Sequence, residues 1–241
     1  MLKISGLNKS YAKNDIKAVD NLSLEVRPGE IFGFIGPNGA GKTTTIKMIC
    51  GILAPDSGRI EIAGHSITDD PIAAKRSLGY VPDNHEVYEM LSGAEYLDFM
   101  ADMYGVSTAD RKERIHHYLS LFSLSDAGSD PIKSYSHGMK QKLVITGALL
   151  HKPALWILDE PMTGLDPKSA LLLKQEMRAH CNEGNTVFFS THVLEVAEKL
   201  CDRIGIINHG RLVAVGTLDE LRSGSDESLE SIFMECTEGS V

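Results

Sequence analysis

The sequence predicts an α/β fold that combines a mixed, largely parallel sheet with an N-terminal antiparallel β subdomain and an inserted helical subdomain. Three observations support this prediction. Short apolar runs separated by Gly, Pro and Asn fill the first third of the chain, two helical patterns fill the middle, and strand and helix patterns alternate in the last part. Such alternation is typical of βαβ units, which build parallel sheets.

The first third contains the strand-like runs LKISGL, LSLEV, EIFGFIG, GRIEIAG and LGYVP. Each run is short and is bounded by turn residues, as strands are. One helix interrupts them. It begins at Gly41–Lys42 and is expected to carry Ile46, Ile49 and Leu53 on one face.

The middle of the chain, from about residue 92 to 124, has the periodicity of two helices. Ser92 and Glu95 form a capping-box pattern before Leu97 and Met100, and this pattern marks the start of a helix. We therefore expect a helical subdomain inserted at about residues 84–150.

The last part alternates between the strand-like runs ALWILDE, TVFFST, RIGIIN and RLVAVG and the helical runs KSALLLKQEMRAHCNE and VLEVAEKLC. We expect one domain over residues 1–222, a short link at SGSDES, and a C-terminal helical tail within residues 223–241. The tail has an apolar stripe formed by Leu229, Ile232, Phe233 and Cys236. We expect it to pack on its own core, and packing against a second copy stays open.

Composition argues against several classes of protein. The 241 residues carry a formal net charge of −9 at pH 7, and Lys and Arg form no basic stripe, so no nucleic acid is expected as a partner. None of the four cysteines belongs to a Cys-x-x-Cys pair, which favours reduced thiols in the cytosol. No signal-peptide pattern and no run of ~20 apolar residues is found. If the protein works at a membrane, we expect another chain to span it.

The stretch GFIGPNGAGKTTT carries the strongest local signal. Its Gly-x4-Gly-Lys-Thr pattern lies between an apolar strand and a helix, as a phosphate loop requires. Backbone N–H groups at the helix N-terminus would bind phosphate, Lys42 would reach the outer phosphates, and the Thr43 hydroxyl would bind Mg²⁺. The alternative is a plain Gly-rich turn. The expected nucleotide contacts are Gly36, Pro37, Asn38, Gly39, Ala40, Gly41, Lys42, Thr43 and Thr44.

Polar residues follow two buried strand patterns. Asp159 ends ALWILD and is expected to hold Mg²⁺ directly or through water, and Glu160 is expected to act as general base. An exposed acidic strand end is the alternative. His192 follows TVFFST, whose end should lie at the same rim as the phosphate loop. There it could contact the γ-phosphate and the attacking water, although a lone histidine is more often a packed or surface residue.

A second polar helix start lies in SYSHGMKQKL. Ser136 can cap a helix, Gly138 follows, and Met139, Leu143 and Leu150 recur at roughly helical spacing. A plain helix cap is one interpretation, and an anion-binding helix N-terminus is the other.

Together these motifs resemble the ATP-binding-cassette (ABC) transporter family over nearly the whole chain, with its P-loop NTPase core. YSHGM stands in the place of the family's Leu-Ser-Gly-Gly-Gln signature, which implies that Ser136 and Gly138 bind the γ-phosphate of ATP held by the other subunit. The resemblance also implies that Tyr11 stacks on adenine, where a strand-surface tyrosine is the alternative. GLDP resembles the family's D-loop, which implies that Asp166 lies at the subunit contact. An ordinary turn is the other interpretation.

The sequence departs from the family pattern in two motifs. Asp83, in YVPDNHEVYEMLSGAEYL, stands where the family commonly has glutamine. A carboxylate can still serve Mg²⁺ or its water, but it cannot donate an amide hydrogen bond. In the signature, His137 replaces the first glycine and Met139 replaces the glutamine. The resulting form resembles the ABC-2 type subgroup, which exports drugs and polysaccharides.

The resemblance implies an ATPase that uses ATP and Mg²⁺ and works as a homodimer or pseudo-dimer of ATPase subunits. It would drive transport, and export in particular, through separate transmembrane permease subunits. These would bind the helical subdomain and the loop around Asp83, at the cytoplasmic face of the cell membrane. Two alternatives stay open: a soluble cassette ATPase that is not involved in transport, and a regulatory module that holds ATP with little turnover.

Overall fold

The computed structural model describes residues 1–11, 17–84, 87–222 and 227–238. The strands within these residues are β1 (Leu2–Ser10), β2 (Lys17–Val26), β3 (Ile31–Ile35), β4 (Ser57–Ile62), β5 (His65–Ser66), β6 (Leu78–Val81), β7 (Leu155–Asp159), β8 (Thr186–Thr191), β9 (Arg203–Asn208) and β10 (Arg211–Gly216). The helices are α1 (Lys42–Ile49), α2 (Pro71–Arg76), α3 (Gly93–Met103), α4 (Thr108–Leu121), α5 (His137–Leu149), α6 (Pro167–Asn182), α7 (Leu194–Leu200), α8 (Leu218–Arg222) and α9 (Leu229–Glu238).

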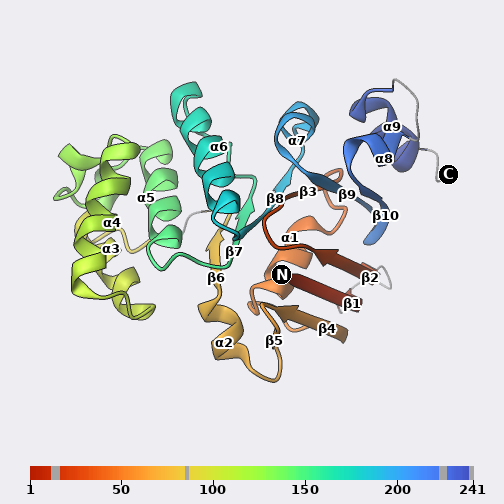
Figure 1. Ribbon diagram of the computed structural model, residues 1–241, viewed down its shortest axis with the longest axis horizontal. Helices are drawn as coiled ribbons and strands as arrows, with labels where there is room; N and C mark the ends of the chain where they lie inside the picture. The colour runs from red at the N-terminus through yellow and green to blue at the C-terminus, as the bar shows by residue number, and fades with distance from the viewer. Residues whose placement is uncertain (12–16, 85–86, 223–226, 239–241) are drawn as a thin grey trace.

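The strands of the described residues form a four-stranded sheet of order β2-β1-β4-β5 and a six-stranded sheet of order β10-β9-β3-β8-β7-β6 (Figure 1). The smaller sheet is antiparallel. In the larger sheet the neighbours from β9 to β6 run parallel, and β10 pairs antiparallel with β9. The predicted antiparallel N-terminal region and mixed sheet are confirmed.

The central strands of the larger sheet are fully enclosed. Every residue of β3, β7 and β8 is buried, which explains why their sequences are continuous apolar runs rather than alternating ones. Because these strands are parallel, their carboxyl ends meet at one edge of the sheet. The segments that follow β3, β7 and β8 therefore lie close together, and these are the segments that carry the predicted site.

Helices α3, α4 and α5 form a layer beside β6 and β7 (Figure 1). Ser92 caps α3, since its Oγ accepts from Glu95 N at 3.2 Å while the Glu95 carboxylate accepts from Ser92 N at 2.7 Å. The predicted capping box is thus confirmed. Apolar residues of this layer, such as Leu97 and Leu143, share one buried cluster with Trp156 of β7, so the helical layer is packed onto the sheet.

Helix α1 is shorter than the sequence pattern predicted. It ends at Ile49, and Leu53 lies outside it. Gly51 has a φ of +62°, a conformation that favours glycine and turns the chain away from the helix axis. Leu53 still packs on the core, from the loop that follows. The apolar residues therefore keep a helical spacing up to Leu53, although the helix itself ends at Ile49.

Helix α9 packs on its own chain. Leu229 and Ile232 are buried against Ile35, Ile204 and Ile206, as expected for the apolar stripe. The link predicted at SGSDES falls mostly on residues outside those that the structure describes. Among the described helices, none is long and apolar enough to cross a bilayer.

Candidate nucleotide-binding site

A pocket of about 370 Å³ lies at the carboxyl edge of the larger sheet. It is lined by Tyr11, Ala18, Asn38, Gly39, Gly41, Lys42, Thr43, Thr44, Asp83 and Glu160. Segments far apart in the sequence thus meet in one place, and most of the predicted contacts are among them. Gly36, Pro37 and Ala40, which were also predicted as nucleotide contacts, are not among the residues that line it.

The phosphate loop is confined by backbone on both sides. A Cβ atom on Gly36 would lie 2.4 Å from the Ile207 carbonyl oxygen, and one on Gly41 would lie 2.4 Å from that of Ala18. Gly41 is also the N-cap of α1, with a φ of 108° and no side-chain cap. The N–H groups of the first turn are therefore left without a side-chain acceptor and can bind an anion.

Lys42 is held inside the loop. Its Nζ donates to the carbonyl oxygens of Gly36 at 2.6 Å and Pro37 at 3.2 Å, and the residue is buried. Burial lowers the pKa of Lys42, while the charges of Glu160 and Asp159 act to raise it. The ammonium is thus a preformed point charge beside the loop amides, suited to phosphate oxygens.

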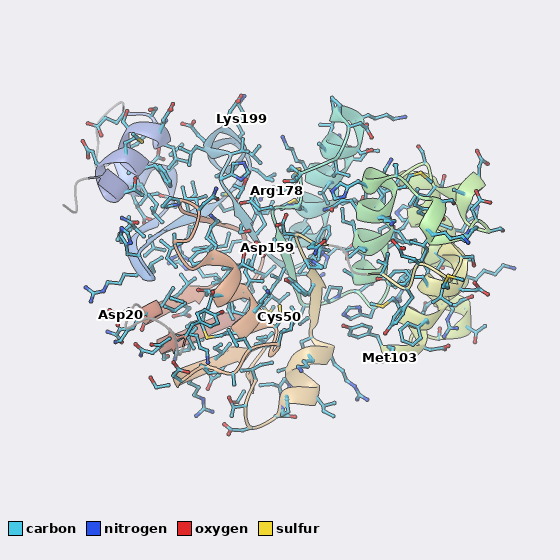
Figure 2. All side chains as sticks on the ribbon, turned by 180° about the vertical axis from the view of Figure 1, so that it is seen from behind. Asp20, Cys50, Met103, Asp159, Arg178 and Lys199 are labelled. Atoms are coloured by element: carbon cyan, nitrogen blue, oxygen red, sulfur yellow. The ribbon has the colours of Figure 1, made fainter. Side chains whose placement is uncertain are left out.

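Asp159 lies at the centre of the molecule (Figure 2) and is 1% exposed. Its Oδ1 accepts a hydrogen bond of 2.5 Å from Ser190 Oγ. Its Oδ2 is buried and has no hydrogen-bond partner among the described residues. Burial raises the pKa of Asp159, Ser190 and Thr43 oppose the rise, and Asp83 and Glu160 add to it.

These oxygens fit a divalent cation. A buried carboxylate oxygen without a partner is costly, and Mg²⁺ prefers such hard oxygen ligands. The described residues contain no group of three or more His, Cys, Asp or Glu that could hold a metal by themselves. Mg²⁺ in nucleotide sites commonly takes one or two carboxylates and completes its shell with water and phosphate. Thr43, Asp83 and Asp159 could supply the protein part of that shell.

Glu160 and His192 are in direct contact. His192 Nδ1 lies 3.0 Å from Glu160 Oε2, and the His192 backbone N–H donates to the same oxygen at 3.4 Å. Because a carboxylate only accepts, Nδ1 must carry the proton in this contact, which leaves Nε2 available to another partner. His192 is mostly exposed, whereas the Glu160 side chain is largely covered. The backbone of Glu160 has a φ of 50°, which is uncommon for a residue other than glycine.

Tyr11 stands at the rim of the pocket with half of its surface exposed. Its hydroxyl lies 3.4 Å from Thr44 Oγ1. An exposed aromatic ring beside a phosphate loop is a suitable surface for a planar base. Stacking of Tyr11 on adenine stays a prediction of the resemblance.

Ser136 and Gly138 do not line this pocket. Ser136 is the N-cap of α5, as predicted, and its Oγ accepts from Met139 N at 3.3 Å. A Cβ atom on Gly138 would lie 2.9 Å from the Gly164 carbonyl oxygen, so glycine at this position allows the start of α5 to approach the GLDP turn. Within one chain this helix start and the phosphate loop are separate.

Two side chains, Ser190 and Gln141, connect the site in ways that the sequence did not predict. Ser190 touches Asp159, as described above, and its Oγ also accepts from Glu160 N at 3.1 Å. Gln141 of α5 is buried and donates to the Pro161 carbonyl oxygen at 3.1 Å. The sequence did contain a signal for both residues, because Ser190 lies within a buried apolar run and Gln141 lies near the start of one. Buried polar groups need hydrogen-bond partners.

Asp166 serves as a helix cap within its own chain. Its Oδ1 accepts from Ser169 N at 3.0 Å, its Oδ2 accepts from Ser169 Oγ at 2.6 Å, and Lys142 Nζ lies 3.7 Å away. The hydrogen bonds from Ser169 lower the pKa of Asp166 to about 2. This geometry agrees with an ordered turn at GLDP and leaves the backbone of that turn beside α5.

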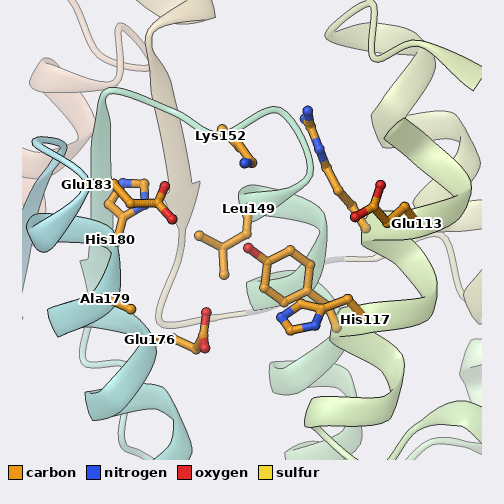
Figure 3. Close-up of a pocket in the computed structure, with 10 residues that line it drawn as sticks. Glu113, His117, Leu149, Lys152, Glu176, Ala179, His180 and Glu183 are labelled. Atoms are coloured by element: carbon orange, nitrogen blue, oxygen red, sulfur yellow. The ribbon is translucent and has the colours of Figure 1, made fainter. Parts of the chain in front are cut away.

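A second hollow, of about 330 Å³, lies between α4, the end of α5 and α6 (Figure 3). It contains none of the predicted site residues. His117 lies at its edge and is exposed. Burial raises the pKa of Glu176 and lowers that of His180 on the facing helix. This hollow is separate from the phosphate loop.

Comparison with known proteins agrees with the geometry. Residues 19–163 match the family described as ABC transporter. The chain is 39% identical over 95% of its length to the linearmycin resistance ATP-binding protein LnrL of Bacillus subtilis (strain 168), of which it covers 74%. It is 36% identical over 98% of its length to the ABC-type transporter ATP-binding protein EcsA of the same organism, of which it covers 96%.

Solved structures show the same relationship. An ATP-binding subunit of an ABC transporter superposes with a TM-score of 0.93 at 36% identity, covering 98% of this chain and 99% of that one. The resemblance found in the phosphate loop, the Asp159–Glu160 pair and the α5 start thus extends over the entire fold. The chain belongs to the ABC transporter family. Within that family it is one of the ATP-binding subunits, which are ATPases.

Proposed function

We propose that this chain hydrolyses ATP for an exporter whose membrane-spanning segments belong to a separate permease chain. The observation that carries the catalytic part is the 3.0 Å contact between Glu160 and His192 at a pocket that also contains Lys42, Thr43 and Asp83. The similarity to a linearmycin resistance protein supports export. Residues 1–222 would act as one domain, with the helical insertion at about 84–150 and a C-terminal tail.

In this proposal Glu160 is the general base. Its Oε2 is occupied by His192, so Oε1 is the oxygen that accepts a proton from the attacking water. His192 holds the carboxylate in place and offers Nε2 to the γ-phosphate. Lys42 and the loop amides from Gly39 to Thr44 bind the phosphates. Mg²⁺, when bound through Thr43, Asp159 and Asp83, supplies positive charge beside the phosphate oxygens.

Ser136 and Gly138 are proposed to act on the nucleotide of a second copy. The start of α5 is a helix N-terminus, which attracts anions, and it lies away from the pocket of its own chain. A dimer would place it against the partner's γ-phosphate. ATP would then favour the closed dimer because it binds that state better, and hydrolysis would release it.

The permease is proposed to dock beside the loop that carries Asp83. Large apolar side chains are exposed there, on the segment that follows this loop and on α3: Tyr88 62%, Met90 81%, Phe99 39% and Met103 67%. Tyr88 and Phe99 meet edge to face at 5.7 Å. An exposed apolar patch of this kind is typical of an interaction surface. Docking there would place the chain at the cytoplasmic face of the membrane.

Purification of the tagged chain from detergent-solubilised native membranes tests the transport part. We expect a polytopic membrane protein to copurify stoichiometrically with the chain, and the M90K substitution to weaken that association. Recovery of the chain with ribosomal or other cytosolic partners alone would contradict the transport assignment and leave the ATPase assignment standing.

A further inference from the structure

Ser190 lies between the two carboxylates that the proposed chemistry uses. It is fully buried in β8. Its Oγ donates to Asp159 Oδ1 at 2.5 Å and accepts from Glu160 N at 3.1 Å. A hydroxyl has one proton to donate and lone pairs that accept. One side chain therefore satisfies both neighbours at once.

Strand register explains why Ser190 reaches both residues. In the parallel pair of β7 and β8, Asp159 lies directly beside Ser190. The chain then turns at Glu160, whose φ is 50°. This turn directs the Glu160 N–H back toward β8, where it meets both Ser190 Oγ and the Ser190 carbonyl oxygen, the latter at 3.3 Å. The hydroxyl thus supports an uncommon backbone conformation at the proposed general base.

The same hydroxyl makes the two oxygens of Asp159 unequal. Oδ1 is occupied by Ser190, whereas Oδ2 is buried without a partner among the residues that the structure describes. Without the hydroxyl, neither oxygen would be fixed by this bond, and the carboxylate could rotate. Groups that hydrogen-bond a metal ligand commonly set its orientation and affect metal affinity.

We propose that Ser190 is a positioning residue that orients Asp159 toward the divalent cation and fixes the backbone of Glu160 beside the attacking water. This inference rests on the roles proposed above for Asp159 and Glu160. It adds Ser190, from the neighbouring strand β8, to Asp159 and Glu160, which the sequence motifs already indicate.

The test is the affinity of Mn²⁺ for the full chain in the presence of a non-hydrolysable ATP analogue, measured by electron paramagnetic resonance. We expect S190A to weaken Mn²⁺ binding about tenfold or more, the range seen when partners of metal ligands are removed. Binding of the nucleotide in EDTA should stay within about twofold, because the phosphate loop is untouched. S190T retains a hydroxyl and should recover most of the Mn²⁺ affinity.

T186V is the matched control. Thr186 is fully buried in the same strand, and its Oγ1 donates to the Arg27 carbonyl oxygen at 3.0 Å, away from the carboxylates. We expect T186V to lose a buried hydrogen bond yet bind Mn²⁺ like the unmodified chain. If S190A does not fold, S190C, which is close in size and a weak donor, should show the same selective loss.

Wild-type Mn²⁺ affinity in folded S190A, or an equal loss in T186V, would overturn the role of Ser190. A different outcome would refute the underlying function. If the unmodified chain with bound nucleotide took up no Mn²⁺ at all, the metal role of Asp159 would fall together with the inference.

Discussion

The starts of α1 and α5 are two helix N-termini built for different tasks. Helix α1 follows Gly41, which offers no side-chain cap, and Lys42 lies beside it on two backbone carbonyls. Helix α5 follows Ser136, whose hydroxyl already accepts from Met139 N. The first leaves its amides open to an anion of its own pocket. The second has a locally satisfied cap and does not line the pocket at the phosphate loop of its own chain.

The two helix starts differ in where each site would be completed. The phosphate loop has its proposed base, its proposed metal ligands and the aromatic ring of Tyr11 within one chain. The α5 start has a glycine packed against the GLDP turn and a hydroxyl, but its proposed ligand would come with another copy. Substitutions at the first start should therefore change the chemistry of a single chain, and substitutions at the second should act only when two copies meet.

The largest expected effect is that of E160Q at the first site. The amide cannot accept a proton as a general base does, so turnover should fall about 10²–10⁴-fold. Nucleotide affinity should be retained, since the phosphate loop is unchanged. Phosphate release under saturating Mg-ATP measures this. E195Q is the control, because Glu195 pairs with Lys199 at the exposed start of α7. A loss of activity in E195Q as large as that in E160Q would argue against a specific effect.

S136A should affect the second site alone. A hydrogen bond to a charged group is worth about 1.5–3 kcal/mol, which corresponds to a loss of about 10–100-fold in turnover. The affinity of a single chain for ATP should be unchanged. S107A is the matched control: Ser107 caps α4 in the same way, with Asp110 N at 3.2 Å. Both variants should lose similar stability, about 1 kcal/mol, and equal activity would mean that Ser136 is a cap and nothing more.

His151, just beyond the C-terminal end of α5, should make the stability of the fold sensitive to acid, whether or not nucleotide is bound. The His151 ring stacks on Tyr104 with centroids 3.7 Å apart, and its Nε2 donates to the Leu78 carbonyl oxygen at 3.1 Å. Burial lowers the pKa of His151 to about 4. The neutral ring stabilises the fold above its unfolded pKa of about 6.5, and this contribution is lost as pH falls toward 4.

In H151F, the loss of unfolding free energy between pH 7 and pH 4.5 should be smaller by on the order of 2 kcal/mol. Phenylalanine keeps the ring contact and cannot take up a proton. Urea unfolding between pH 7 and pH 4.5 measures it. An unchanged pH dependence in H151F would contradict the assigned burial of the neutral ring. ATPase activity at pH 7.5 serves to show that the variant is folded.

The smallest predicted effect is a gain of stability at the first site. Asp159 is buried with one unpartnered oxygen, and burial raises its pKa, so the folded state of the metal-free chain binds a proton more tightly than the unfolded state. The ordinary pKa of an aspartate is 3.8. The free energy of unfolding should therefore fall as pH rises from 3.8 through the raised pKa of Asp159 in the folded chain. D159N removes the buried charge and should raise the melting temperature in EDTA by about 2–4 °C, or ~1 kcal/mol. A lower melting temperature would contradict this account.

The two starts also differ in what their sequences could predict. The phosphate loop is a local motif, so its spacing could predict that Gly41, Lys42 and Thr43 lie together where β3 leads into α1, and the structure has them lining one pocket. The Ser136 cap is equally local. Ser190 could not be found this way, since its contact with Asp159 joins positions 31 residues apart and depends on the register of β7 against β8. The end of α1 was predicted wrongly, because apolar spacing continued through Gly51 into a loop that packs on the same core.

Light scattering of E160Q at saturating Mg-ATP tests the central claim most directly, namely that the α5 start completes a site in a second copy. We predict the mass of a dimer with Mg-ATP, the mass of a monomer without nucleotide, and a shift back toward monomer when S136A is added to E160Q. A monomer at saturating Mg-ATP would contradict the claim and leave Ser136 as the cap of its own helix.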